Sequence, residues 1–122
     1  MIAYIMLGGV LGTLARYLTQ GLIQPRAGTF PGGTLAINIA GSFLLGFIMR
    51  LATGSTVMSP ELRGGLTIGF CGAFTTMSTF SYESMRLLGD GEYWHAGLYM
   101  GGTVLGCLAA VITGTALASK LL

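Results

Sequence analysis

Charged residues are scarce in this sequence. Lysine and arginine number six and aspartate and glutamate four, which is 8% of the 122 residues, whereas 52% of the residues are hydrophobic. Mean hydropathy is +0.76. A soluble domain of this length needs far more surface charge. The composition therefore excludes a water-soluble domain and predicts an integral membrane protein, and we expect no nucleic-acid partner.

The residues that most enzymes use are missing or isolated. There is one histidine, and the two cysteines, Cys71 and Cys107, share no CxxC spacing. The sequence contains no nucleophile–base set, metal-ligand cluster or phosphate-binding loop. We therefore expect no enzymatic activity, and we interpret both cysteines as small apolar packing residues.

Long uncharged runs separate the few charges. Crossing the hydrocarbon core of a bilayer takes about 20 residues of helix. The runs predict an all-α membrane protein, a single domain over residues 1–122 with four spans, near residues 2–23, 32–52, 62–86 and 94–119. Pro25 and Pro31 lie in the first connection and should stop the first helix there. Ser59-Pro60-Glu61 has the cap, proline and acidic residue typical of a helix start.

The third predicted span differs in composition from the other three. Its stretch from Gly69 to Glu83 contains two glycines and five serine or threonine residues. Glycine weakens a helix by about 1 kcal/mol relative to alanine, and hydroxyl side chains offer the backbone competing hydrogen bonds. Irregular backbone at membrane depth survives only inside protein or beside a wet cavity. The composition predicts a helix broken within residues 72–79, and a functional site there.

Glycine is abundant, with 21 residues in the chain. Small residues spaced four apart allow membrane helices to approach closely. We therefore expect tight packing, including packing against a second subunit. The pairs with this spacing are Gly8/Gly12, Gly65/Gly69, Gly97/Gly101 and Gly102/Gly106.

Basic residues do not favour one side of the membrane. With four spans, one side would hold Arg50, Arg63 and Lys120, and the opposite side Arg16, Arg26 and Arg86. An excess of lysine and arginine on one side normally orients a membrane protein. A chain without this signal can insert both ways and pair as an antiparallel dimer. Taken alone, the charge count also leaves open a single orientation with weak bias.

Three motifs occur in order along the chain: Gly8-Gly-Val-Leu-Gly-Thr-Leu-Ala-Arg-Tyr17, Thr34-Leu-Ala-Ile-Asn-Ile-Ala-Gly-Ser-Phe43 and the stretch Gly69–Glu83. Together they resemble the CrcB/Fluc family of fluoride channels. The resemblance implies a dual-topology antiparallel homodimer in the bacterial inner membrane. It also implies two pores that passively export fluoride from the cytoplasm and so lower its toxicity. A structural sodium ion would lie at the dimer interface, where the third helix breaks.

The resemblance also implies roles for individual residues. The backbone carbonyls of Gly72 and Thr75 would coordinate sodium. Neutral hydrogen-bond donors and aromatic ring edges suit fluoride, because fixed cations would bind it too tightly for conduction. The predicted fluoride pathway comprises Arg16, Thr34, Asn38, Met77, Ser78, Thr79, Phe80, Glu83, Tyr99 and Thr103.

Asn38 and Met77 in this set, and Cys107 outside it, each carry an open question. Asn38 could instead serve as a structural clamp between helices, since an unpaired amide in a membrane span is costly. Met77 stands where the family usually has a first phenylalanine beside the ion. Cys107 stands where a serine is often found.

Two other classes of protein have this size and hydrophobicity. A small dual-topology multidrug or cation exporter depends on a carboxylate deep in its first helix, and residues 2–23 contain none. A structural subunit of a larger membrane complex would account for the glycines. It would not account for the polar residues 72–79.

Overall fold

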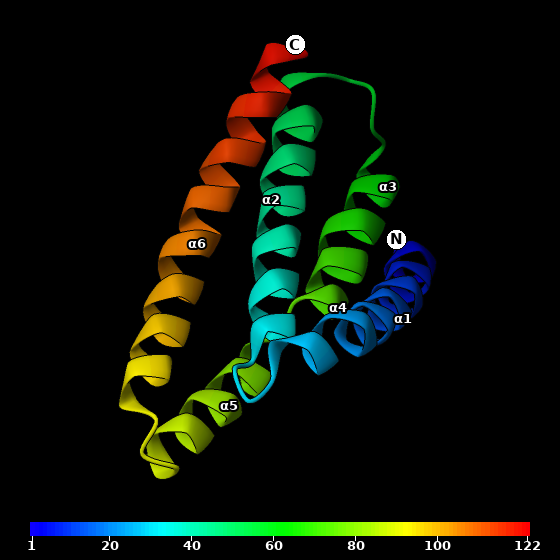
Figure 1. The fold of residues 1–122 in the computed structure, drawn as a ribbon. Coiled ribbons are helices and arrows are strands. Elements are labelled where there is room, and N and C mark those ends of the chain that lie inside the picture. Colours follow the sequence, from blue (N-terminus) through cyan, green and yellow to red (C-terminus); the bar gives the residue numbers. More distant parts are fainter.

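The computed structural model describes all 122 residues, and the chain is entirely helical, as predicted. Three helices are long and apolar enough to cross a membrane: α1 (Ile2–Ala27), α2 (Gly32–Gly54) and α6 (Tyr93–Lys120). They correspond to the spans predicted near residues 2–23, 32–52 and 94–119. Helices α2 and α6 lie side by side along most of their length (Figure 1).

The span predicted near residues 62–86 is two helical pieces. The first is a continuous rod formed by α3 (Pro60–Gly64), η1 (Gly65–Cys71) and α4 (Gly72–Phe74). After extended backbone at Thr75 and Thr76, helix α5 (Met77–Gly89) begins and leaves in a new direction (Figure 1). The predicted break is confirmed and is shorter than expected, because residues 72–74 and 77–79 are helical.

One prediction about helix ends is confirmed and one is wrong. Ser59 caps α3 as expected, and its hydroxyl accepts a hydrogen bond from the Leu62 N–H at 3.1 Å. Helix α1, however, continues through Pro25 to Ala27. The side chain of Gln24 donates to the Phe30 carbonyl at 3.0 Å and accepts from the Gly33 N–H at 3.0 Å. These bonds stabilise the last turn and the following connection, so the proline does not end the helix.

Glycines bring two pairs of helices into close contact. A Cβ atom at Gly8 or Gly12 of α1 would collide with backbone of η1, and one at Gly114 of α6 with the Phe43 carbonyl of α2. The expected close packing is therefore present within the chain for Gly8, Gly12, Gly65 and Gly69. For Gly97, Gly101 and Gly102 it is not, because a Cβ atom there would meet nothing within 4 Å.

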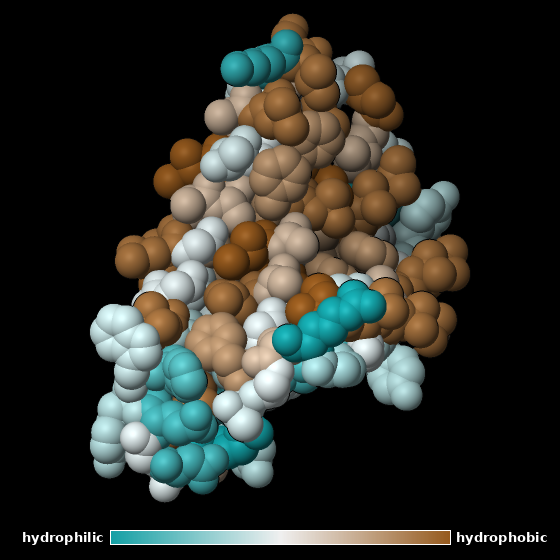
Figure 2. Space-filling model, in the orientation of Figure 1, coloured by the Kyte–Doolittle hydropathy of each residue, from teal (hydrophilic) through white to brown (hydrophobic).

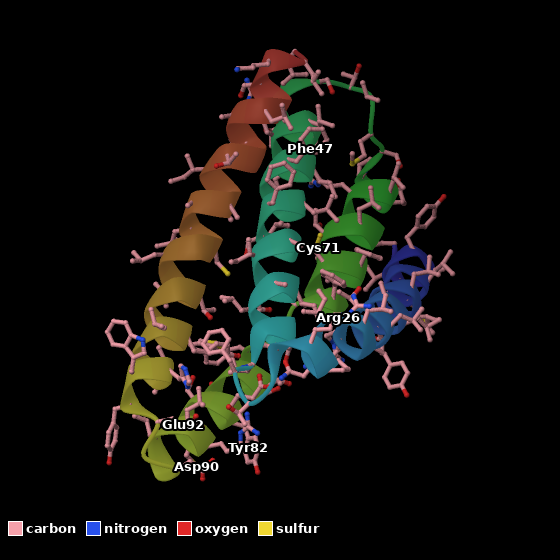
Figure 3. The ribbon with its side chains drawn as sticks, viewed as in Figure 1. Arg26, Phe47, Cys71, Tyr82, Asp90 and Glu92 are labelled. Carbon is pink, nitrogen blue, oxygen red and sulfur yellow. The ribbon has the colours of Figure 1, made fainter.

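Most of the surface is apolar. Only 22 of the 122 residues are buried, and large apolar side chains are exposed along α1 and α6. Hydrophilic residues gather at the end formed by α5 and the α5–α6 turn (Figure 2). Tyr82, Asp90 and Glu92 lie at this end (Figure 3). The remaining apolar surface suits contact with lipid or with another membrane protein.

Candidate functional site

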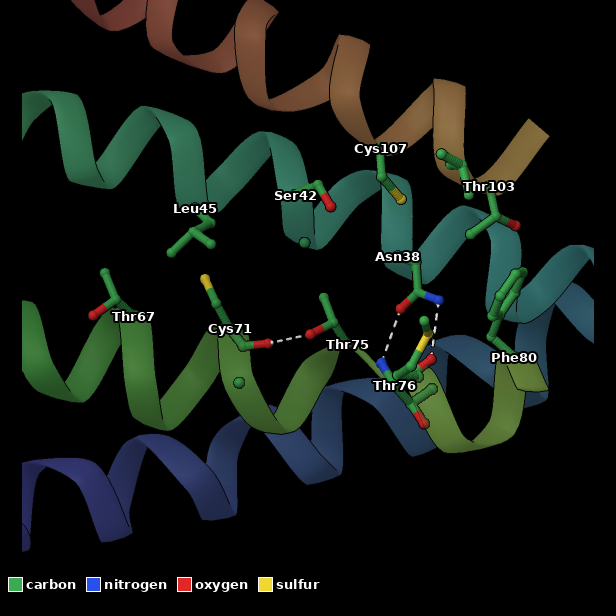
Figure 4. Close-up of a pocket in the computed structure, with 14 residues that line it drawn as sticks. Asn38, Ser42, Leu45, Thr67, Cys71, Thr75, Thr76, Phe80, Thr103 and Cys107 are labelled. Carbon is green, nitrogen blue, oxygen red and sulfur yellow. Dashed lines mark hydrogen bonds between the residues drawn. The ribbon is translucent and has the colours of Figure 1, made fainter. Parts of the chain in front are cut away.

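The break between α4 and α5 is held by Asn38 of α2. The Asn38 Nδ2 atom donates to the Thr76 carbonyl at 3.1 Å, and the Asn38 Oδ1 atom accepts from the Thr76 N–H at 2.9 Å (Figure 4). Asn38 is buried. It therefore does act as a clamp between helices, and the second hydrogen of its amide is left for another acceptor.

The clamp changes which carbonyls are free. In a continuous helix the Thr76 N–H would donate to the Gly72 carbonyl, four residues back. Here it donates to Asn38 instead. Likewise the Thr79 N–H, the helical partner of the Thr75 carbonyl, donates to the Thr76 hydroxyl at 3.3 Å. Both carbonyls predicted for sodium therefore lose their helical donors.

Arg16 reaches the same broken turn from α1. Its Nε atom donates to the Ala73 carbonyl at 3.0 Å. No carboxylate pairs with Arg16, since the chain's one ion pair joins His95 and Glu92. Arg16 does not line the cavity described next. It lies in a separate groove along α1, of about 900 Å³, with Gln20 and Gln24.

A cavity of about 360 Å³ opens beside the break. It lies among α2, η1, α4, α5 and α6 (Figure 4). It brings together six of the predicted residues, and no lysine, arginine, histidine, aspartate or glutamate lines it. The six are Asn38, Gly72, Thr75, Met77, Phe80 and Thr103.

Thr103 and Cys107 project from α6 toward this cavity. Thr103 is only 7% exposed, and its hydroxyl has no hydrogen-bond partner within the chain. A buried hydroxyl without a partner is unfavourable by roughly 1–3 kcal/mol, so a ligand that accepts its hydrogen bond would be stabilised there. Cys107, whose contribution the sequence left open, lines the same cavity.

Tyr99 and Glu83 form a second group next to the cavity. The Tyr99 hydroxyl donates to Glu83 Oε1 at 3.0 Å, and Tyr99 is fully buried. Its ring lies 5.2 Å from that of Phe80, at an angle of 45°. Phe80 therefore joins the two groups, because it contacts Tyr99 and also lines the cavity. Thr34 is buried but does not line the cavity.

The start of α5 carries three predicted residues, Met77, Ser78 and Thr79. Ser78 and Met77 are exposed, Met77 to 72%, and neither Ser78 nor Thr79 lines the cavity. The sequence reasoning gave no role to Thr76, whose hydroxyl caps α5 through the Thr79 N–H. The signal was available, since threonine directly before a resuming helix is a preferred N-cap residue.

Known proteins match this chain over nearly its whole length. Residues 3–115 match the family described as CrcB-like protein, Camphor Resistance (CrcB). The protein named fluoride-specific ion channel FluC from Geobacter sulfurreducens is 51% identical over 114 residues, covering 93% of this chain and 92% of the relative. The protein of the same name from Chlorobaculum tepidum is 52% identical over 112 residues, covering 91% and 88%. A third, from Geotalea daltonii, is 48% identical over 118 residues, covering 96% and 95%. With a family match over most of its residues and relatives of about 50% identity along nearly all of its length, this chain belongs to the CrcB family.

Proposed function

We propose that this protein is a fluoride-specific ion channel that exports fluoride passively from the bacterial cytoplasm. The observation that carries the proposal is the uncharged cavity at the break, with the unpaired Thr103 hydroxyl and the Phe80 ring on its wall. Close relatives that are named fluoride-specific channels support it. The chain is a channel and not an enzyme.

The wall of the cavity suits an anion that must enter and leave quickly. Hydroxyl and amide donors can replace part of fluoride's hydration shell, and the positive edge of an aromatic ring adds attraction. A fixed cation in the same place would hold the anion too strongly for conduction. Arg16, which lies outside the cavity, can attract anions toward the broken turn without trapping them. Thr34, Ser78, Thr79, Glu83 and Tyr99 would extend the pathway beyond the cavity.

The broken turn also suits a sodium ion. Sodium favours oxygen ligands, and carbonyls from unwound membrane helices are a general way to bind it. The Gly72 and Thr75 carbonyls lack their helical donors, which leaves both free to coordinate a cation. Such an ion would contribute positive charge that holds the broken turns together.

A second copy of this chain, inserted in the opposite direction, would complete the site. Gly72 is exposed, and a Cβ atom there would come no closer than 3.8 Å to any neighbouring atom. Packing within one chain therefore does not explain why residue 72 is glycine, whereas close approach of a partner would. The three-to-three division of basic residues supports dual topology.

Dual topology predicts that a C-terminal reporter tag is accessible from both sides of the membrane. Adding two lysines at the C-terminus should trap one orientation and lower the activity of the protein expressed alone. Accessibility of the tag from one side only, in the unmodified chain, would contradict dual topology.

Passive, selective transport can be tested with purified protein in liposomes. We expect prompt fluoride efflux down its gradient, measured with a fluoride electrode, and no chloride efflux from matched vesicles. Protein-free liposomes are the control. Equal flux of the two ions would overturn the proposed selectivity.

A further inference from the structure

The Gly72 and Thr75 carbonyls are freed by two side chains, those of Asn38 and Thr76. The Asn38 Oδ1 atom accepts a hydrogen bond from the Thr76 N–H at 2.9 Å, and the Thr76 hydroxyl accepts one from the Thr79 N–H at 3.3 Å. Each of these N–H groups is the helical donor for one carbonyl, the first for Gly72 and the second for Thr75. The side chains therefore remove both donors that would otherwise occupy the carbonyls.

A buried N–H group must find an acceptor. In a membrane protein an unpaired backbone group is unfavourable by several kcal/mol. If the Thr76 hydroxyl were absent, α5 could extend backward by one turn, and the Thr79 N–H would then donate to the Thr75 carbonyl. If the Asn38 amide were absent, the Thr76 N–H could return to the Gly72 carbonyl in the same way. Either change would occupy a carbonyl that a cation needs.

Neighbouring groups limit which carbonyls can be free. The Ala73 carbonyl, which lies between the two, accepts from Arg16 at 3.0 Å. The Cys71 carbonyl accepts from both the Thr75 N–H, at 3.0 Å, and the Thr75 hydroxyl, at 2.9 Å. The Thr76 carbonyl is bonded to Asn38 at 3.1 Å. The turn is therefore arranged so that the Gly72 and Thr75 carbonyls lose their helical donors, while the Cys71, Ala73 and Thr76 carbonyls accept hydrogen bonds.

We propose that Asn38 and Thr76 are positioning residues for a monovalent-cation site, and that they act by withholding the Thr76 and Thr79 N–H groups from the Gly72 and Thr75 carbonyls. This inference rests on the proposed sodium site and adds the residues that create it. It predicts that the capacity of residue 76 to cap a helix, and not its volume, determines sodium affinity.

The test is a sodium titration of thermal stability. A ligand that binds only the folded protein raises the melting temperature as its concentration increases. Purified protein would be melted in sodium chloride at increasing concentration, with N-methylglucamine chloride keeping ionic strength constant. This readout does not depend on transport, so it is independent of any role of Asn38 in the fluoride pathway.

Thr76→Ser and Thr76→Asn keep a capping side chain and should keep the wild-type sodium dependence. Thr76→Val and Thr76→Ala remove the cap and should raise the sodium concentration for half-maximal stabilisation by about fivefold or more, the equivalent of a typical lost cap. Asn38→Ala should raise it as well. The matched control is Thr113→Val, which makes the same chemical change at an exposed residue of α6 whose hydroxyl bonds only to the Ala109 carbonyl.

The outcomes separate this inference from the proposed function. If the wild-type protein shows no sodium dependence beyond ionic strength, the sodium site itself is wrong. If the wild type responds to sodium but Thr76→Val, Thr76→Ala and Asn38→Ala respond equally, the positioning role alone is wrong. A loss of affinity that follows side-chain volume across the Thr76 series would also overturn it.

Discussion

The α2–α6 pair and the segment from Pro60 to Gly89 are built from similar residues but differ in backbone structure. Both contain glycines that bring backbones into contact: Gly46 and Gly114 between α2 and α6, and Gly65 and Gly69 against α1. Yet α2 and α6 are uninterrupted α-helices, whereas the other segment is π-helical over Gly65–Cys71 and breaks after Phe74.

The difference lies in where the backbone hydrogen bonds go. Helices α2 and α6 keep their own backbone hydrogen bonds throughout. The bonds between them, from the Thr115 hydroxyl to the Gly46 carbonyl at 3.4 Å and from Arg50 Nε to the Ser119 hydroxyl at 2.9 Å, leave both helices regular. At the break, Arg16 from α1 and Asn38 from α2 provide bonds to the backbone of Ala73 and Thr76. Local widening of a helix is frequent at functional sites. The irregular segment thus gains free carbonyls beside an uncharged cavity, whereas α2 and α6 keep their carbonyls bonded along the helix.

The largest expected effect comes from removing the aromatic ring at Phe80. If ring edges bind the anion, Phe80→Ile should lower fluoride flux by about tenfold or more, which is about 1.4 kcal/mol in barrier, while the protein still folds. Met77→Ile should have a small effect, because Met77 is exposed and has no ring. Phe47→Ile, in the regular α2 helix, is the matched control and should affect stability only. Flux in liposomes measures the first property, and melting temperature together with a single peak on gel filtration measures the second.

Comparable, mild effects of Phe80→Ile and Met77→Ile would mean that Phe80 only fills space beside Tyr99. Phe80 would then serve the same packing role as the aromatic residues of the regular α2 helix. Met77→Phe adds a further check, since it restores the usual aromatic pair and should leave flux similar or moderately changed.

A smaller effect is expected from adding one methyl group at each glycine contact. Gly12→Ala would meet the Phe70 carbonyl of η1, and Gly114→Ala would meet the Phe43 carbonyl of α2. Overpacking of this kind destabilises by about 1–3 kcal/mol, so both should lower the melting temperature. Only Gly12→Ala should also lower fluoride flux per folded protein, because η1 leads directly into the broken turn.

Gly9→Ala is the control for this pair, since a Cβ atom there would meet nothing within 4 Å. It should raise the melting temperature slightly, because alanine favours a helix over glycine by about 1 kcal/mol, and it should leave the flux unchanged. If Gly114→Ala lowered flux per folded protein as much as Gly12→Ala, the regular pair would be as closely coupled to the site as the irregular segment.

Much of the site could be predicted from residue types. The glycines and hydroxyl residues of 69–83 indicated a break, and the cavity there is lined by Asn38, Phe80 and Thr103, which were named for their chemistry. The grouping of Tyr99 with Glu83 could not be read from the chain, because it depends on α5 turning back against α6. Arg16 was expected near the pathway. It lies in a separate groove because of the face of α1 that packs against η1, and the sequence does not show which face that is.

The sequence by itself determined that the chain is a membrane protein, where its spans lie and that the third one breaks, because charge, hydrophobicity and helix propensity act locally. Only the tertiary structure decided that the break is two residues long and that the Gly72 carbonyl loses its helical donor. That choice rests on Asn38, which lies 38 residues away from Thr76 in the chain. A hydrogen bond across such a separation forms only when packing brings α2 beside the break. Helix α1 runs past Pro25 for a more local reason, since Gln24 bonds to Phe30 and Gly33 in the connection and the first turn of α2 that follow it.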